Sequence, residues 1–162
     1  MKREELEKWV AVLKEKNPLG MPSTIFNMLL QEQDEFKADL QIAKFIDRLL
    51  PNEYEEALKI YKTVLTEENI ERVLKDRNEN GLEEIIEEIV WGYMNAAIIF
   101  ASKKDDLPKA LKYINKSKDF MNCHPIDMAY ISKGEVYYTR WKLLEKFGKV
   151  EEVLSEINEL LK

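Results

Sequence analysis

The sequence predicts an all-α protein of about eight helices, arranged as antiparallel helix pairs. Along most of the chain, apolar residues recur at the spacing of three and four that places them on one helix face. The 162 residues include only five Gly and five Pro, and four of the prolines fall where helices are expected to begin or end. No stretch alternates with the period of two that a β-strand needs, so a sheet is not expected.

Length and composition indicate one soluble domain over residues 1–162, since 45% of the residues are hydrophobic and 35% are charged. Cys123 is the only cysteine, which excludes an intrachain disulfide and favours a reducing, cytoplasmic setting. The N-terminus lacks the apolar core of a signal peptide, and no apolar run approaches the ~20 residues of a membrane span. Because a net charge of −6 would repel a phosphate backbone, we expect neither nucleic acid nor a membrane as partner.

The N-terminal region, residues 1–50, is predicted to hold helices without a clear repeat. Residues 5–16 place four large apolar side chains on one face, and the segment 17–20, which contains Pro and Gly, ends this helix. After Pro22, Ser23 is expected to cap a second helix. A third helix is predicted from about Asp34 to Leu50. Whether the second and third helices are continuous stays open.

Residues 51–80 are predicted to form a helix of a degenerate pair and an extra short helix. Pro51 forces a break, and Asn52 followed by Glu55 has the spacing of a capping box for a helix that ends near Leu65. The next helix is expected to be capped by Thr66 and to reach about Arg77.

The longest predicted helix runs from Asn80 to about Lys103 and is apolar on nearly all sides, so we expect it to be the central element. The segment from Asp105 to Pro108 opens a further helix that extends to about residue 120. Residues 124–125 open another, which runs to about 147 and is ended by Gly148. An apolar stripe over residues 150–161 predicts the last helix.

Three segments share one pattern, in which a large apolar residue is followed by a smaller one at +3 and a large one at +7. They are Tyr54-Ala57-Tyr61, Leu107-Ala110-Ile114 and Val150-Val153-Ile157. The segments 93–100 and 130–138 share a second pattern, with an aromatic residue at each end and a small residue between. In both patterns, residues 82–162 resemble two helix pairs of the tetratricopeptide repeat family. The middle residues of the first pattern, Ala57, Ala110 and Val153, lie 53 and 43 residues apart, whereas the family's repeats are 34 residues long.

The resemblance implies a superhelix whose first helices line a concave groove for a peptide. By the same resemblance, Asn95 stands where peptide-binding members of the family present an amide, which can donate and accept hydrogen bonds at once. The alternative is that Asn95 bonds a neighbouring helix end. Ser132 is the equivalent residue of the next pair. The other groove candidates implied by the resemblance are Met94, Ile98, Ile131, Glu135 and Tyr138.

No pattern in the sequence indicates catalysis, a cofactor or a metal. His124 is the only histidine and adjoins Cys123, so we interpret it as part of a helix start beside Pro125 rather than as a ligand. Phosphate-binding glycine loops are absent. Lys109, Lys112 and Lys116 share one helix face, which we interpret as a solvated surface.

Two functions remain as hypotheses. The first is a protein-interaction module that binds a peptide or a helical segment of a partner in a groove between the helices at 82–103 and 126–147. The second is a structural or assembly protein that forms a homodimer through the C-terminal helix, because the stripe from Val150 to Leu161 has no polar covering helix after it. An enzyme would need a pocket with perturbed carboxylates and is not predicted.

Overall fold

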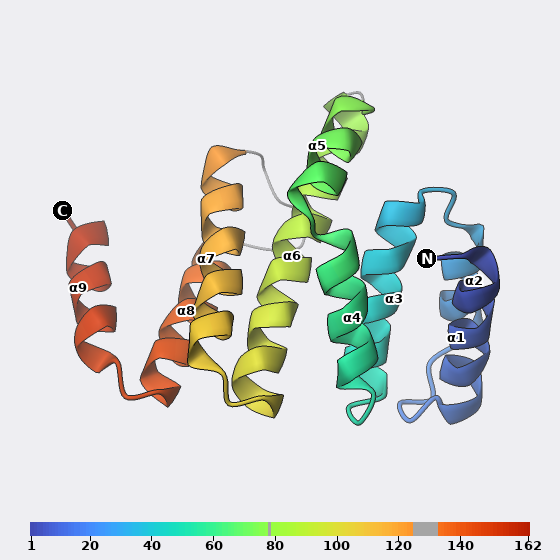
Figure 1. Ribbon diagram of the computed structural model, residues 1–162, viewed down its shortest axis with the longest axis horizontal. Coiled ribbons are helices and arrows are strands. Elements are labelled where there is room, and N and C mark those ends of the chain that lie inside the picture. Colours follow the sequence, from blue (N-terminus) through green and yellow to red (C-terminus); the bar gives the residue numbers. More distant parts are fainter. Residues whose placement is uncertain (78, 125–132) are drawn as a thin grey trace. The chain divides into compact units, whose positions relative to one another are not determined.

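The computed structural model describes residues 1–77, 79–124 and 133–162 (Figure 1). Within these ranges all regular structure is helical, which confirms the predicted all-α class. The described residues form nine helices rather than about eight, because residues 32–34 separate the second helix from the third. The chain divides into two compact units, Met1–Gly92 and Tyr93–Lys162, with the division inside the sixth helix.

The first unit begins with a three-helix cluster. It consists of α1 (Arg3–Lys16), α2 (Ser23–Gln31) and α3 (Glu35–Leu49). Helix α3 packs on both α1 and α2. The buried ring of Phe26 and the partly buried ring of Phe45 meet edge to face at 5.8 Å between centroids, a favourable aromatic geometry. This cluster supplies a large part of the core of the first unit.

Helices α4 (Tyr54–Val64) and α5 (Glu67–Lys75) follow, and α4 packs along α3. The Thr66 hydroxyl accepts a hydrogen bond from the Asn69 amide at 3.2 Å, which confirms the predicted cap of α5. The predicted caps at Ser23 and Asn52 are wrong. Ser23 is already the first helical residue of α2, and α4 has Glu53 at its N-cap without a side-chain hydrogen bond.

Helix α6 (Glu79–Lys103) is the longest element, as predicted, and most of its side chains are buried. Its segment Gly81–Lys103 is long and apolar enough to cross a membrane by length and composition, contrary to the expectation that no run approaches that length. In the structure, 78% of the most apolar window of this segment is buried inside the protein. Burial as a core helix therefore accounts for its composition.

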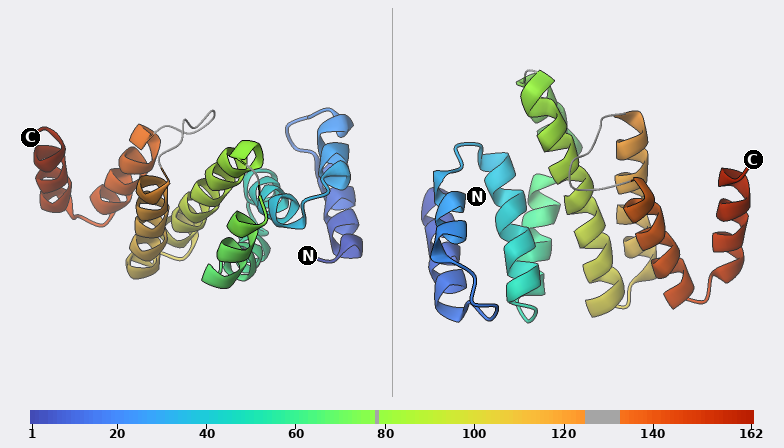
Figure 2. Two further views of the ribbon diagram at one scale, coloured as in Figure 1. Left: turned by 90° about the horizontal axis from the view of Figure 1, so that it is seen from above. Right: turned by 180° about the vertical axis from the view of Figure 1, so that it is seen from behind.

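The second unit contains the C-terminal part of α6 with α7 (Leu107–Cys123), α8 (Lys133–Lys146) and α9 (Val150–Leu160). Helix α7 packs on α8, and α8 packs on α9 (Figures 1 and 2). The Asp106 carboxylate caps α7 by accepting from the Lys109 amide at 3.0 Å. Gly148 ends the α8 segment with φ of +72°, a conformation that favours glycine, as predicted. Residues 125–132 of the predicted eighth helix lie outside the described residues.

In the first unit, α3 and the N-terminal part of α6 lie parallel. The side chain of Lys37 contacts Glu84 at 2.5 Å, Gln41 donates to Glu88 at 3.2 Å, and both contacts join residues 47 apart. Gly92 permits a close approach, because a Cβ atom there would lie 3.1 Å from a methyl carbon of Leu65.

In the second unit, α6 and α8 also lie parallel. The Thr139 hydroxyl donates to the Met94 sulfur, and the Lys146 ammonium donates to the Ala101 carbonyl. Each contact joins residues 45 apart. Within each unit the two helices so joined run in the same direction, and the contacting residues are 47 and 45 apart, more than the 34 residues of a tetratricopeptide repeat.

Candidate functional site

The expected groove lies along the contact between α6 and α8. Met94 is buried under α8, where its sulfur accepts the Thr139 hydrogen bond at 3.5 Å. Asn95 is also buried, with 6% of its surface exposed. Neither side chain lines an open groove in this conformation, so both would have to be uncovered before a ligand could touch them.

Three predicted residues do reach solvent. Ile98 is exposed on α6, and Glu135 and Tyr138 are exposed on α8. Tyr138 is the largest of them, with 57% of its surface accessible. Ser132 and Ile131 lie outside the described residues. The exposed members with large apolar area are therefore Ile98 on α6 and Tyr138 on α8.

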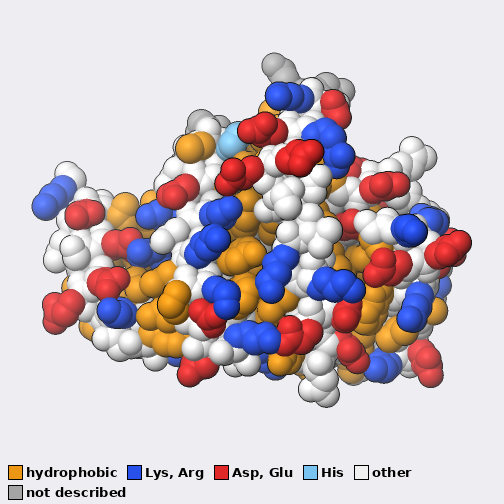
Figure 3. Space-filling model, viewed as in Figure 1, with side chains coloured by type: hydrophobic (Ala, Val, Ile, Leu, Met, Phe, Trp, Pro, Cys, Tyr) orange, Lys and Arg blue, Asp and Glu red, His pale blue; other side chains and the backbone are white. Residues whose placement is uncertain are grey.

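The solvent-facing stripe of α8 extends beyond the predicted residues. Lys142 lies one turn after Tyr138, with its ammonium 5.8 Å from the centre of the tyrosine ring, and pairs with Glu145 at 2.9 Å. The space-filling view shows hydrophobic side chains reaching the surface among charged ones in the region of α8 (Figure 3).

A pocket of about 210 Å³ opens between α8 and α9 next to Tyr138. Its apolar lining comes from Tyr138, Trp141, Val150 and Val153, and Lys142 and Glu145 border it. The sequence analysis did not identify this pocket. The signal was present, because Tyr138 and Trp141 are three residues apart on one helix and Val150 and Val153 are three apart on the next.

Arg140 and Glu156 fasten α9 to the rest of the second unit. The Arg140 guanidinium donates to Asn115 of α7 at 2.8 Å and pairs with Glu156 of α9 at 2.5 Å. Glu156 also accepts from the Trp141 indole nitrogen at 2.9 Å. Only 12% of the Arg140 side chain and 21% of the Glu156 side chain are exposed. This partly buried cluster positions Trp141 at the edge of the pocket.

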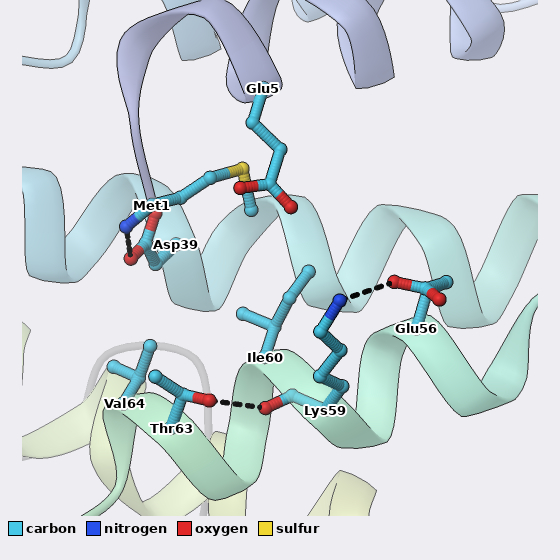
Figure 4. A pocket seen from close by; sticks show the side chains of 8 residues that line it. All are labelled: Met1, Glu5, Asp39, Glu56, Lys59, Ile60, Thr63 and Val64. Carbon is cyan, nitrogen blue, oxygen red and sulfur yellow. Dashed lines mark hydrogen bonds and ion pairs between the residues drawn. The ribbon is translucent and has the colours of Figure 1, made fainter.

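A second pocket, of about 130 Å³, lies in the first unit where α1 meets α3 and α4 (Figure 4). Asp39 pairs there with the Met1 ammonium, and Lys59 pairs with Glu56 at 3.5 Å. Burial raises the pKa of Asp39, and the Met1 ammonium offsets part of that rise. Since these polar groups engage one another and the volume is below that of typical ligand pockets, we interpret the pocket as part of the fold.

Glu88 is a partly buried carboxylate whose pKa is also raised by its burial. The Gln41 amide at 3.2 Å and the nearby Lys44 favour the ionised form and offset part of the effect. Burial in turn lowers the pKa of Lys44. The two side chains lie on the α3–α6 surface of the first unit, where Lys37 also pairs with Glu84.

His124 stands at the end of α7, and the helix start predicted beside Pro125 lies outside the described residues. It is the C-cap residue of α7, its ring nitrogen Nδ1 lies 2.9 Å from the Phe120 carbonyl, and its ring packs on that of Phe120 at 4.2 Å between centroids. Helix α7 extends to Cys123, past its predicted end at residue 120. Among the described residues, no group of three or more His, Cys, Asp or Glu side chains is placed to hold a metal ion.

The lysines of α7 cover aromatic rings of α6. Lys109 lies 5.7 Å from the centre of the Phe100 ring, and Lys116 lies 5.8 Å from that of Tyr93. These distances are within the range of cation–π contacts. Lys109 and Lys116, which were interpreted from the sequence as part of a solvated surface, therefore also contact the aromatic rings of α6 and stabilise the packing of the second unit.

Comparison of the chain with models of protein families, with curated proteins and with solved structures gave no match.

Proposed function

We propose that this protein is an interaction module that binds a peptide or a helical segment of a partner protein on the α6–α8 surface. The observation that carries the proposal is Tyr138, a large aromatic side chain left more than half exposed on a helix whose opposite face is packed. Exposed aromatic residues beside apolar pockets are typical anchors of protein interfaces. The pocket beside Trp141 adjoins Tyr138, and Ile98 on α6 is a second exposed apolar side chain.

The parallel packing of the helices supports the proposed array of tetratricopeptide-like pairs. In such an array the first helix of each pair lies along the first helix of the next, and their exposed faces form one continuous surface. Helices α3 and α6 run parallel in the first unit, and α6 and α8 do so in the second. The proposal does not require that the helix pairs have the family's repeat length. It depends only on the direction of the first helix of each pair and on the exposure of that helix.

Peptides selected from a random displayed library against the full chain test the proposal. Tyr138→Ala should weaken selected peptides at least tenfold, as removal of an aromatic anchor does. Ile98→Ser should weaken them by a smaller factor. Met28→Gln is the matched control, because Met28 is an exposed apolar residue of α2 in the other unit, with 65% of its surface accessible.

Asn95→Ala tests the family's amide contact directly. A loss of peptide affinity with an unchanged circular dichroism melt would indicate that the buried amide becomes a ligand contact. Peptides that bind the Tyr138 and Ile98 variants as tightly as the original chain would show that the surface is wrongly assigned.

A further inference from the structure

Helix α9 has the smallest buried face of the described helices. It packs on α8 (Figure 2), and none of its residues is buried, whereas each of the other described helices buries at least two side chains. Its partly covered side chains are those of Val153, Glu156 and Ile157. They lie at positions i, i+3 and i+4, so they form the single face by which α9 meets α8.

One carboxylate makes the polar attachment of this face. Glu156 accepts a hydrogen bond from the Trp141 indole nitrogen at 2.9 Å and pairs with Arg140 at 2.5 Å. Within the described residues, no other α9 side chain forms an ion pair or a hydrogen bond with another helix. A helix held by one carboxylate and two partly covered apolar side chains is expected to detach and redock more readily than the helices of the core.

The groups that receive this carboxylate are positioned by neighbours other than α9. The Arg140 guanidinium donates to the Asn115 side chain of α7 at 2.8 Å. The Trp141 ring lies 6.2 Å from the ring of Tyr137 on the same helix, measured between centroids. When α9 detaches, these contacts persist. A carboxylate that arrives on another helix therefore meets two donors that are already in place, which lowers the cost of binding it.

These donors restrict what can take the place of α9. A guanidinium and an indole N–H have no acceptor, so they pair with a carboxylate and reject a cationic side chain. The apolar contacts at Val153 and Ile157 lie three residues before and one residue after the carboxylate of Glu156, a spacing that puts all three on one face of an α-helix. The matching ligand is an amphipathic helix with a glutamate inside its apolar stripe.

We propose that α9 is a releasable cover on α8, and that the face beneath it, centred on Arg140 and Trp141, binds an acidic amphipathic helix of a partner protein in place of α9. Helix α9 then acts as an intramolecular competitor, and the fraction of molecules with α9 detached sets the apparent affinity for the partner. The α6–α8 surface of the proposed function uses the exposed Ile98 and Tyr138 instead, and neither proposal depends on the other.

The test uses the full chain and a labelled peptide that repeats residues 149–162. A lactam bridge between positions 151 and 155, both exposed in the chain, holds the peptide helical. Fluorescence anisotropy should show that Glu156→Ala binds this peptide at least about tenfold more tightly than the original chain, because the variant releases its own α9. Glu159→Ala, an exposed position of the same helix, is the matched control and should bind like the original chain. Equal affinity of the three chains would overturn the proposal.

Changes in the peptide test the recognition without altering the protein. A peptide with glutamine in place of Glu156 should bind the Glu156→Ala chain about tenfold more weakly, because an amide brings no charge to Arg140. A designed helix of otherwise unrelated sequence that keeps only the Val, Glu and Ile of this face should bind with affinity comparable to that of the original peptide. Equal binding of the glutamine peptide, or failure of the designed helix, would contradict the proposal.

A second copy of the chain is the alternative occupant, because its α9 carries the same carboxylate. Light scattering that shows a dimer of the original chain, lost in Glu156→Ala, would identify exchanged α9 helices and would contradict a separate partner.

Ile98→Ser distinguishes this face from the α6–α8 surface. Added to Glu156→Ala, it should leave the affinity for the peptide unchanged. A loss of that affinity would place the peptide on the α6–α8 surface and would overturn this proposal while leaving the proposed function intact.

Discussion

Replacing Glu156 with alanine should detach α9 from α8, because this carboxylate is the main polar contact between the two helices. It accepts from the Trp141 indole at 2.9 Å and pairs with Arg140 at 2.5 Å. Apolar contacts hold α9 only weakly, since none of its residues is fully buried. Without Glu156, the Arg140 charge would also lose its ionic partner in a largely buried position.

The free energy lost on removing Glu156 follows from the burial of its ion pair with Arg140. Removing one partner of a fully buried ion pair costs about 3–5 kcal/mol, and removing one from an exposed pair costs about 0–1 kcal/mol. With 12% of the Arg140 side chain and 21% of the Glu156 side chain exposed, the pair lies between these limits. We therefore expect the docked state of α9 to lose roughly 2–3 kcal/mol, which corresponds to about a 30- to 150-fold shift toward detachment.

Hydrogen exchange read by mass spectrometry measures this shift helix by helix. In Glu156→Ala, amides of α9 should exchange faster by that factor, while those of α3 keep their protection. Glu159→Ala is the matched control, because it makes the same substitution at an exposed position of the same helix. Equal protection of α9 in both variants would refute the assigned role of the Glu156 cluster.

Three further predictions concern stability. Phe26→Ala should lower the free energy of unfolding of the first unit by about 3–5 kcal/mol in urea denaturation, because the ring is fully buried against Phe45; a loss below about 1 kcal/mol would contradict the packing. Thr66→Ala should cost about 1 kcal/mol through loss of the α5 cap, seen as faster exchange of α5 amides, and unchanged exchange would show that the cap is not needed. The pKa of Glu88 is higher in the folded protein than in the unfolded chain. Its contribution to the free energy of unfolding is therefore fully present below the pKa of the unfolded state, and it is lost as the pH rises through the pKa of the folded state. Denaturation at pH 4 and pH 7 should therefore show Glu88→Gln gaining stability relative to the original chain at the higher pH, and a relative loss would reverse the assigned sign.

Much of the helical architecture could be predicted because it depends on local information. The three-and-four spacing of apolar residues predicted the helices, the cap at Thr66 is confirmed, and α7 begins within the predicted segment 105–108. The caps at Ser23 and Asn52 were wrong because a capping pattern does not fix the residue at which the helix begins. Likewise, the predicted end of α7 at residue 120 was three residues short, because the helix extends to Cys123.

The candidate site was less predictable because exposure depends on distant neighbours. Met94 and Asn95 are buried, and the residue that contacts Met94, Thr139, lies 45 positions away on α8. Periodicity shows that a helix has an apolar face but not which neighbour covers it. Tyr138 was predicted from the family resemblance and is exposed, whereas Trp141 was missed because the pocket exists only where α8 and α9 meet.

The central claim, that the α6–α8 surface binds a protein segment, is tested most directly by NMR on the 15N-labelled full chain. Backbone amide shifts are recorded while a peptide selected against the chain is added. The account predicts that the largest shifts surround Ile98 on α6 and Glu135 and Tyr138 on α8, and that they disappear in Tyr138→Ala. Shifts confined to the first unit, or to α9 alone, would contradict it.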